Sequence, residues 1–170
     1  VSVINTATNA VTATIDVGTL PYGIAVSPDG TFAYATNAGD DSVSVISTAT
    51  NTVVATIGVG NTPADVTFTP DGAYAYVTDA ISDSVTVINT GTRTVVTTIT
   101  DITNPVAVSI SPDGARAWIE SPWGPPSPDD PLDGLVAQVT RPRRLGALLV
   151  RRNAHAVGVF EGSELVLHRV

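Results

Sequence analysis

The sequence has 170 residues, of which 43% are hydrophobic and 14% charged, with a formal net charge of −8 and no Cys. Without Cys, neither a disulfide framework nor a thiolate metal site can form, and the apolar content excludes an intrinsically disordered chain. The acidic balance argues against nucleic-acid binding by most of the chain, because phosphate backbones attract basic surfaces. We expect no transmembrane segment, since no stretch of about 18 apolar residues occurs.

An internal repeat with a period of 42 residues runs through residues 1–119. The turn motif Ser/Thr-Pro-Asp-Gly marks each copy and occurs at 27–30, 69–72 and 111–114. The segment VSVINTATNAVTATI, which opens the first copy, recurs in similar form in the next two copies at the same spacing. A fixed period of this length indicates one supersecondary unit repeated along the chain.

Each copy predicts four short strands separated by turn residues. In the second copy the predicted strands are 42–47, 52–59, 64–69 and 73–79. Alternating apolar and polar residues, rich in Val and Thr, favour strands, and the Pro-Asp-Gly sequence favours a tight turn. We therefore expect a four-stranded antiparallel meander in every copy.

These meanders predict an all-β fold, an incomplete β-propeller with three four-stranded antiparallel blades of 42 residues, followed by a short C-terminal β-meander. A small sheet cannot bury both faces alone, and stacking similar sheets face to face solves this problem. The expected domains are three blades at 1–42, 43–84 and 85–120, a Pro-rich linker at 121–134, and a small basic β segment at 135–170.

The ends of two predicted fourth strands, YATN at 34–37 and YVTD at 76–79, resemble the YVTN-family β-propeller repeat. The third copy departs from this pattern, because Trp118 replaces the Tyr. The resemblance covers residues 1–119 and implies a seven-bladed propeller, usually outside the cytoplasm or on the cell surface. Three blades would not close such a ring, so we expect either a fragment of a larger propeller or self-association through exposed blade faces.

The resemblance leaves two functional alternatives for the blades. The first is a non-enzymatic binding or scaffold module, extracytoplasmic or on the cell surface, with a protein or cell-surface ligand as its partner. The second is a lactonase-like propeller enzyme whose active residues would lie in further blades. The repeats contain no His, so a Ser-His-Asp set cannot be assembled within them.

A third alternative comes from residues 141–170, which resemble the N-terminal strands of an actinobacterial release-factor-like peptidyl-tRNA hydrolase family through PRR, ALLVRR and AVGVFEG. The resemblance implies a fragment of a ribosome-rescue peptidyl-tRNA hydrolase. That family's catalytic loop, which carries a Gln, lies further downstream and has no counterpart here. Five arginines of this tail are candidates for phosphate or RNA contact: Arg141, Arg143, Arg144, Arg151 and Arg152.

Four aspartates cluster after predicted fourth strands and are candidates for a ligand-binding rim: Asp40, Asp41, Asp79 and Asp83. Carboxylate oxygens suit Ca²⁺, but the EF-hand spacing is absent, and solvated loop carboxylates are the simpler interpretation. The only histidines, His155 and His168, lie in the tail without the further ligands that a metal site needs. We therefore predict no catalytic residue, cofactor or metal site in this sequence.

Overall fold

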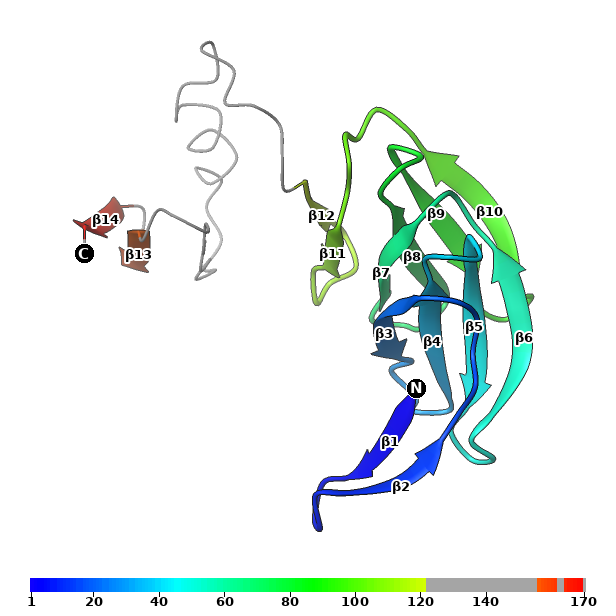
Figure 1. The fold of residues 1–170 in the computed structure, drawn as a ribbon. Helices are drawn as coiled ribbons and strands as arrows, with labels where there is room; N and C mark the ends of the chain where they lie inside the picture. Colours follow the sequence, from blue (N-terminus) through cyan, green and yellow to red (C-terminus); the bar gives the residue numbers. More distant parts are fainter. Residues whose placement is uncertain (122–155, 162–163, 170) are drawn as a thin grey trace. The chain divides into compact units, whose positions relative to one another are not determined.

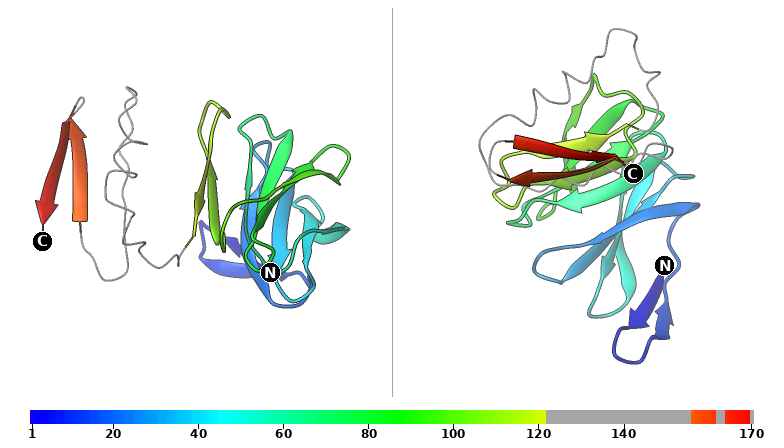
Figure 2. Two further views of the ribbon diagram at one scale, coloured as in Figure 1. Left: turned by 90° about the horizontal axis from the view of Figure 1, so that it is seen from above. Right: turned by 90° about the vertical axis from the view of Figure 1, so that its left-hand side faces the viewer.

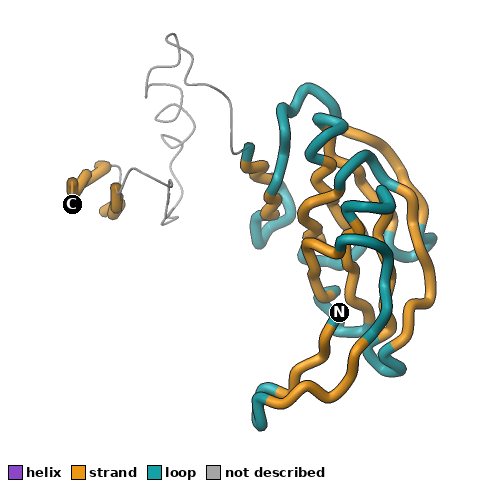
Figure 3. The backbone as a smooth tube through the Cα atoms, in the orientation of Figure 1, coloured by secondary structure: helices purple, strands orange, loops and turns teal. Residues whose placement is uncertain are grey.

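A computed structural model of the chain describes residues 1–121, 156–161 and 164–169 (Figure 1). The chain divides into two compact units, Val1–Gly124 and Pro125–Val170. The described residues of both units form strands and loops alone (Figure 3). Among them, no helix has the length and apolar character needed to cross a membrane.

The first unit contains two four-stranded and two two-stranded antiparallel sheets. Sheet 1 consists of β3 (Pro21–Val26), β4 (Phe32–Asn37), β5 (Ser42–Ser47) and β6 (Thr52–Gly58). Sheet 2 consists of β7 (Pro63–Phe68), β8 (Tyr74–Asp79), β9 (Ser84–Asn89) and β10 (Thr94–Ile99). The N-terminal half-sheet pairs β1 (Ser2–Asn5) with β2 (Ala10–Thr14), and the C-terminal half-sheet pairs β11 (Ala107–Ile110) with β12 (Ala117–Glu120).

This arrangement confirms the predicted all-β fold and the incomplete propeller, but the sheets begin two strands later than the expected blades 1–42, 43–84 and 85–120. The expected boundaries fall inside β5 and β9. The reason is that a short turn joins β4 to β5 and lets them pair, whereas the chain after β6 leaves its sheet to start the next one. The 42-residue period shows how long each repeat is, but not at which residue a sheet begins. Any starting residue gives the same spacing between copies.

Successive sheets pack face to face through their first strands. β7 packs against β3 and β4, and β11 packs against β7 and β8, so that the sheets stand in series in the first unit (Figure 2). The rings of Tyr34 on β4 and Phe68 on β7 meet edge to face, with their centroids 4.9 Å apart. Around this contact lies the main core, formed by buried Val side chains of both sheets such as Val43, Val45 and Val66.

The Pro-Asp-Gly turns join the first and second strands of sheet 1 and of sheet 2, and the two strands of the C-terminal half-sheet. In the first of them, the Asp29 carboxylate accepts hydrogen bonds from the Ser27 hydroxyl at 2.6 Å and from the backbone N–H of Thr31 at 3.0 Å. Gly30 adopts a φ of 74°, a conformation that glycine adopts without a steric penalty. Asp71 and Asp113 accept the equivalent bonds in the next two turns, so all three recurring aspartates act as turn residues.

The second unit contains one described antiparallel hairpin, formed by β13 (Ala156–Glu161) and β14 (Glu164–Arg169). Val157 lies opposite His168 in its register, and Phe160 lies opposite Leu165. The hairpin falls within the segment where the sequence predicted a short C-terminal β-meander. The predicted linker at 121–134 lies, except for its first residue, outside the described residues.

Candidate ligand grooves between adjacent sheets

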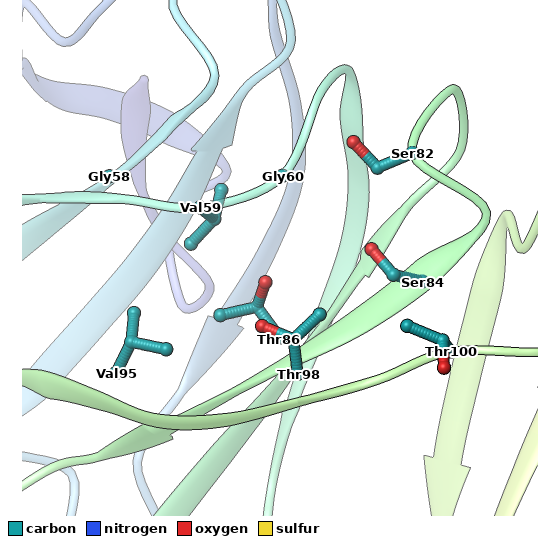
Figure 4. A pocket seen from close by; sticks show the side chains of 9 residues that line it. All are labelled: Gly58, Val59, Gly60, Ser82, Ser84, Thr86, Val95, Thr98 and Thr100. Atoms are coloured by element: carbon teal, nitrogen blue, oxygen red, sulfur yellow. The ribbon is translucent and has the colours of Figure 1, made fainter.

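Two equivalent grooves lie where the connection into one sheet passes the outer strands of a neighbouring sheet. Groove 1 has a volume of about 410 Å³. It is lined by the β6–β7 connection, the β8–β9 loop, strands β9 and β10, and the residue that follows β10 (Figure 4). Its nine lining residues are Gly58, Val59, Gly60, Ser82, Ser84, Thr86, Val95, Thr98 and Thr100. Groove 2, of about 460 Å³, is lined by Asp16, Val17, Gly18, Asn37, Asp40, Ser42, Ser44, Val53 and Thr56.

Most of the residues lining groove 2 lie 42 positions before a residue lining groove 1. Ser and Thr hydroxyls dominate groove 1, and none of its lining residues is charged. One of these hydroxyls also fixes a loop, since the Ser82 Oγ accepts a hydrogen bond from the backbone N–H of Asn61 at 2.6 Å. Groove 2 differs by two carboxylates in its lining, Asp16 and Asp40.

A fully buried polar residue ends the second strand of each four-stranded sheet beside these grooves. Asp79 ends β8, where its Oδ2 accepts hydrogen bonds from Thr86 at 2.6 Å and Ser84 at 3.4 Å. Asn37 ends β4, where its Nδ2 donates to the hydroxyls of Ser42 and Ser44, both at 3.0 Å. In both sheets, two hydroxyls of the third strand therefore hold this side chain in place.

Glycines provide the space for these buried side chains. A Cβ added at Gly60 would lie 2.7 Å from the Cβ and Cγ of Asp79, and one added at Gly18 would lie 2.7 Å from the Cγ of Asn37. In the third copy of the repeat, Ile102 stands at the glycine position, and the small Ser121 stands at the Asn/Asp position. In each copy, a small residue at one of these two positions therefore accompanies a larger residue at the other.

Burial raises the pKa of Asp79 from its ordinary 3.8 to about 6, against the opposing effect of the hydrogen bonds from Thr86 and Ser84. The second carboxylate oxygen, Oδ1, is buried and has no hydrogen-bond partner. A carboxyl group with such a pKa is typical of acid–base sites. Asp79, however, has no exposed surface and does not line groove 1, so a ligand in the groove would not contact it.

The structure separates the four aspartates predicted to form a rim. Asp79 is buried, whereas Asp40, Asp41 and Asp83 are exposed loop residues that bind backbone N–H groups. The Asp41 Oδ1 accepts from Thr62 at 2.9 Å, the Asp83 Oδ1 accepts from Asn104 at 2.7 Å, and the Asp40 Oδ2 accepts from Thr19. These bonds tie each loop to a neighbouring connection.

A ligand-binding role for the three exposed carboxylates stays a prediction. Within the part of the chain that the structure describes, no group of three or more His, Asp or Glu side chains is placed to hold a metal ion. The five tail arginines (Arg141, Arg143, Arg144, Arg151 and Arg152) and His155 lie outside the described residues.

Sequence reasoning missed the grooves, although the repeat contained a signal for them. Gly18 and Gly60 are 42 residues apart, as are Ser42 and Ser84. This recurrence of small and hydroxyl residues would have identified equivalent positions. It would not have shown that a glycine of one connection faces the end of a strand 19 residues later in the chain, as Gly60 faces Asp79.

Sheets that stand in series, each entered from the outer strand of the one before, define the first unit as an open segment of a β-propeller. Residues 31–121, more than half of the chain, match the family model of the YNCE-like β-propellers. The chain belongs to this family.

Solved structures of other propellers resemble the chain. Hydrazine synthase of Kuenenia stuttgartiensis is 35% identical with a TM-score of 0.66, over 68% of this chain and 34% of that one. A functionally unknown protein of Desulfotomaculum acetoxidans is 22% identical with a TM-score of 0.63, over 69% of this chain and 40% of that one. A Bacteroides uniformis protein provisionally assigned as a 6-phosphogluconolactonase is 23% identical with a TM-score of 0.53, over 59% of this chain and 33% of that one.

The last two structures, at 22% and 23% identity, show a similarity of fold alone. The chain spans between 33% and 40% of the length of these three proteins. No curated protein matches it in sequence.

Proposed function

We propose that this chain is a non-enzymatic β-propeller module that binds a protein or cell-surface ligand, outside the cytoplasm or on the cell surface. The observation that carries the proposal is the pair of equivalent grooves, each formed between neighbouring sheets and each lined by Ser and Thr residues, of which Thr98 in groove 1 and Thr56 in groove 2 are exposed. Hydroxyl groups both donate and accept hydrogen bonds. Grooves of this kind, repeated along a propeller, suit a polar partner that is contacted at several equivalent points.

The placement of Asp79 supports binding over catalysis. Burial raises the pKa of Asp79 to about 6. A general acid or base must come within hydrogen-bond reach of the reacting group. Asp79 instead lies buried behind Ser84 and Thr86, whose hydroxyls are engaged in holding it. Its role here is structural.

The YVTN type of the repeat is part of the same proposal, and the contacts of the motif residues give it a physical basis. Tyr34 packs on Phe68 of the next sheet. Thr36 accepts a hydrogen bond from the Gly23 N–H at 2.7 Å and donates across the sheets to the Ala64 carbonyl at 3.3 Å. Asn37 binds the third strand. The Tyr-x-Thr-Asn pattern thus serves to join strands and sheets.

The likeness to hydrazine synthase supports a propeller in this chain and does not extend to that enzyme's activity, because the match covers 34% of its length. The Bacteroides likeness is one of fold. Among the described residues, the buried Asp79 is the one candidate for an acid–base group in a lactonase-like activity, and no other described residue supports such an activity.

The binding proposal is tested on arrays of immobilised glycans and surface proteins probed with the purified chain. Thr98→Trp would fill groove 1, and the equivalent Thr56→Trp would fill groove 2, because both threonines are exposed and line a groove. Thr97→Trp is the matched control, since Thr97 is exposed on the same strand and does not line the groove. We expect binding that both groove variants weaken at least tenfold and the control leaves unchanged. Binding that is insensitive to both groove variants would refute the role of the grooves.

The location is tested separately by protease treatment of intact cells that produce the native protein. Degradation of the protein while a cytosolic marker survives is the expected result. Survival of both until the cells are lysed would contradict an extracytoplasmic location.

A further inference from the structure

The Pro-Asp-Gly turns place a chemically reactive pair of residues on the surface. Three of the four Asp-Gly pairs in the sequence lie in these turns, and their aspartates are exposed: Asp29–Gly30, Asp71–Gly72 and Asp113–Gly114. When glycine follows aspartate, no Cβ hinders an attack of the glycine nitrogen on the aspartate side chain. The product of such an attack is isoaspartate, in which the main chain runs through the side-chain carboxyl group.

The reaction proceeds in two steps and needs only water. First, the glycine nitrogen forms a bond to Cγ of the neutral aspartic acid, its proton joins the departing hydroxyl group, and a water molecule leaves a succinimide ring. Second, water adds to the ring at the former main-chain carbonyl and breaks the original peptide bond. The chain then continues through Cβ and Cγ, and the mass of the protein is unchanged.

The fold requires both members of each pair. The three glycines have φ values of 74°, 70° and 69°, a conformation that strains any residue with a Cβ. Each aspartate in turn accepts a hydrogen bond of 3.0 Å from the backbone N–H two residues later, which closes the turn. The turn therefore cannot exchange either residue without losing its geometry.

We propose that these three pairs are modification sites, at which isoaspartate forms spontaneously, and that the hydroxyl two residues before each aspartate suppresses the reaction in the folded protein. The hydroxyl belongs to Ser27, Thr69 and Ser111, and it donates to the aspartate Oδ1 at 2.6, 2.6 and 2.5 Å. It thus recurs with the reactive pair in every turn.

In the second turn, Thr69 holds both groups that would have to react. Its carbonyl accepts the N–H of Gly72 at 2.8 Å, and its hydroxyl donates to the Asp71 carboxylate. The backbone N–H of Ala73 donates to the same carboxylate oxygen. The nitrogen and Cγ can therefore approach each other only after the Gly72 bond is broken and the carboxylate has turned away from two donors.

The same contacts favour the less reactive form of the carboxyl group. The hydrogen bond from the Thr69 hydroxyl lowers the pKa of Asp71 below its ordinary 3.8, and the bond from the Ala73 N–H adds to this effect. Donors stabilise the ionised form of a carboxyl group. Ring closure requires the neutral form, since hydroxyl is the group that leaves, so loss of the Thr69 hydroxyl would favour the reaction in this way as well.

The first turn has a further donor that the second turn lacks. The Thr31 hydroxyl donates to both carboxylate oxygens of Asp29, at 2.9 and 2.8 Å. Ala73 stands at the corresponding position of the second turn. We therefore expect Asp71 to convert sooner than Asp29 when the native protein ages.

Conversion would alter the packing between sheets, because neighbouring turns lie close together. A Cβ added at Gly72 would lie 3.5 Å from the Cδ of Pro28 in the preceding turn, and one added at Gly114 would lie 3.5 Å from the Cδ of Pro70. Isoaspartate adds one carbon atom to the main chain directly before the glycine. The expected consequence at Asp71 is a displaced Gly72 and a weaker contact between the turns of sheets 1 and 2.

Ageing of the purified full-length chain at 37 °C tests the proposal. Isoaspartate at each pair is measured by digestion and mass spectrometry with electron-transfer fragmentation, which distinguishes the two isomers. Thr69→Val removes the hydroxyl but keeps the carbonyl and the branched shape. It should accelerate conversion of Asp71 at least tenfold, while Asp29 and Asp113 in the same molecules keep their native rates. Equal rates for Asp71 in the variant and the native chain would overturn the role of the hydroxyl.

Two further variants bracket this result. Ala73→Thr supplies the donor that Asp29 has in Thr31, and it should slow conversion of Asp71 toward the rate of Asp29. Thr67→Val is the matched control, because Thr67 lies on the same strand, β7, and its hydroxyl makes no hydrogen bond within the described residues. It should leave every rate unchanged. A native chain in which Asp71 converts no faster than Asp29 would refute the expected order.

The three turns in one molecule also distinguish local protection from a general loss of stability. If Thr69→Val accelerated conversion equally at all three pairs, the variant would be acting through unfolding, and the local role of the hydroxyl would be overturned. In concentrated urea, all three pairs of the native chain should convert at similar rates, each faster than in the folded protein. Equal rates with and without urea would overturn the protection by the fold. If Thr69→Val does not fold, Ser27→Ala decides, since it should accelerate Asp29 alone.

Discussion

Asn37 and Asp79 occupy equivalent positions in consecutive sheets, and the two side chains differ by a single polar group in almost the same surroundings. Both are fully buried, both end the second strand of a sheet, and both are held by two hydroxyls of the third strand. The amide can donate to these hydroxyls, whereas the carboxylate can only accept. The chain therefore contains its own comparison between a neutral and an ionisable group at one kind of site.

Replacing Asp79 by Asn should stabilise the protein at neutral pH. The pKa of Asp79 is raised to about 6 by burial, so the folded state binds the proton more tightly than the unfolded state. Ionisation of Asp79 therefore does not lower the free energy of unfolding below about pH 4. The loss grows as the pH rises toward 6 and is complete above it. A two-unit shift corresponds to at most about 3 kcal/mol. Urea unfolding of Asp79→Asn and wild type should give similar free energies at pH 4 and diverge by pH 7.5.

The converse substitution, Asn37→Asp, is the matched control for this effect. It should destabilise the protein at pH 7.5 and much less at pH 4, because it introduces the ionisable group in sheet 1. An Asp79→Asn profile parallel to that of the wild type at every pH would show that Asp79 does not titrate as described.

Gly60→Ala should destabilise the fold by about 1–3 kcal/mol, the usual cost of overpacking. The new Cβ would lie 2.7 Å from two carbon atoms of Asp79, and Asp79 is itself fixed by hydrogen bonds. Gly58→Ala is the control, because a Cβ there meets no atom within 4 Å. Thermal unfolding should show a lower midpoint for Gly60→Ala alone. Equal midpoints for the two variants would mean that Asp79 can move aside.

Truncating Tyr34→Ala should cost about 3–5 kcal/mol, as expected for a large aromatic side chain removed from a core. The side chain is 2% exposed, and its ring contacts Phe68 across the interface between sheets 1 and 2. Tyr74→Ala, at a position 38% exposed, should cost far less. Chemical denaturation followed by tryptophan fluorescence measures both, and similar losses would contradict the central role of the Tyr34–Phe68 contact.

Thr36→Val should cost about 1–3 kcal/mol, although it preserves the shape of the side chain. It leaves the partly buried Gly23 N–H without the hydroxyl that accepts its hydrogen bond at 2.7 Å, and a donor that loses its partner away from water destabilises the folded state. Thr97→Val is the control, since Thr97 is exposed. Hydrogen exchange at the Gly23 amide should accelerate in Thr36→Val and remain slow in Thr97→Val. An unchanged Gly23 amide would show that another group takes the place of the hydroxyl.

The sequence predicted the strands and the propeller well, because alternating Val and Thr residues and recurring Pro-Asp-Gly turns are local signals. The predicted phase of the sheets is wrong, since β4 and β5 belong to one sheet although the predicted blade boundary falls at 42/43. Which strands pair across a boundary depends on the path of the connections, and the spacing of the copies does not encode it.

The site was less predictable than the fold. The sequence predicts a rim position for Asp79, but the β8–β9 pairing continues to Asp79 and Ser84 and places the side chain in the interior. The exposed Asp41 and Asp83 do lie in loops, where each binds a backbone N–H of a connection 21 residues later. Such long-range partners follow from the packing of neighbouring sheets, which a single sequence does not display.

The offset between sequence copies and sheets has a genetic consequence. If residues 43–84 were lost, β4 would be followed by a strand made of Ser42 and residues 85–89 in place of Ser42–Ser47. These two strands are alternative versions of the same element, so an intact sheet would re-form with native partners and the segment would simply be one blade shorter. Insertion of an extra copy would lengthen it in the same way. Propellers of this kind can therefore change their number of blades by unequal recombination at any point of the repeat.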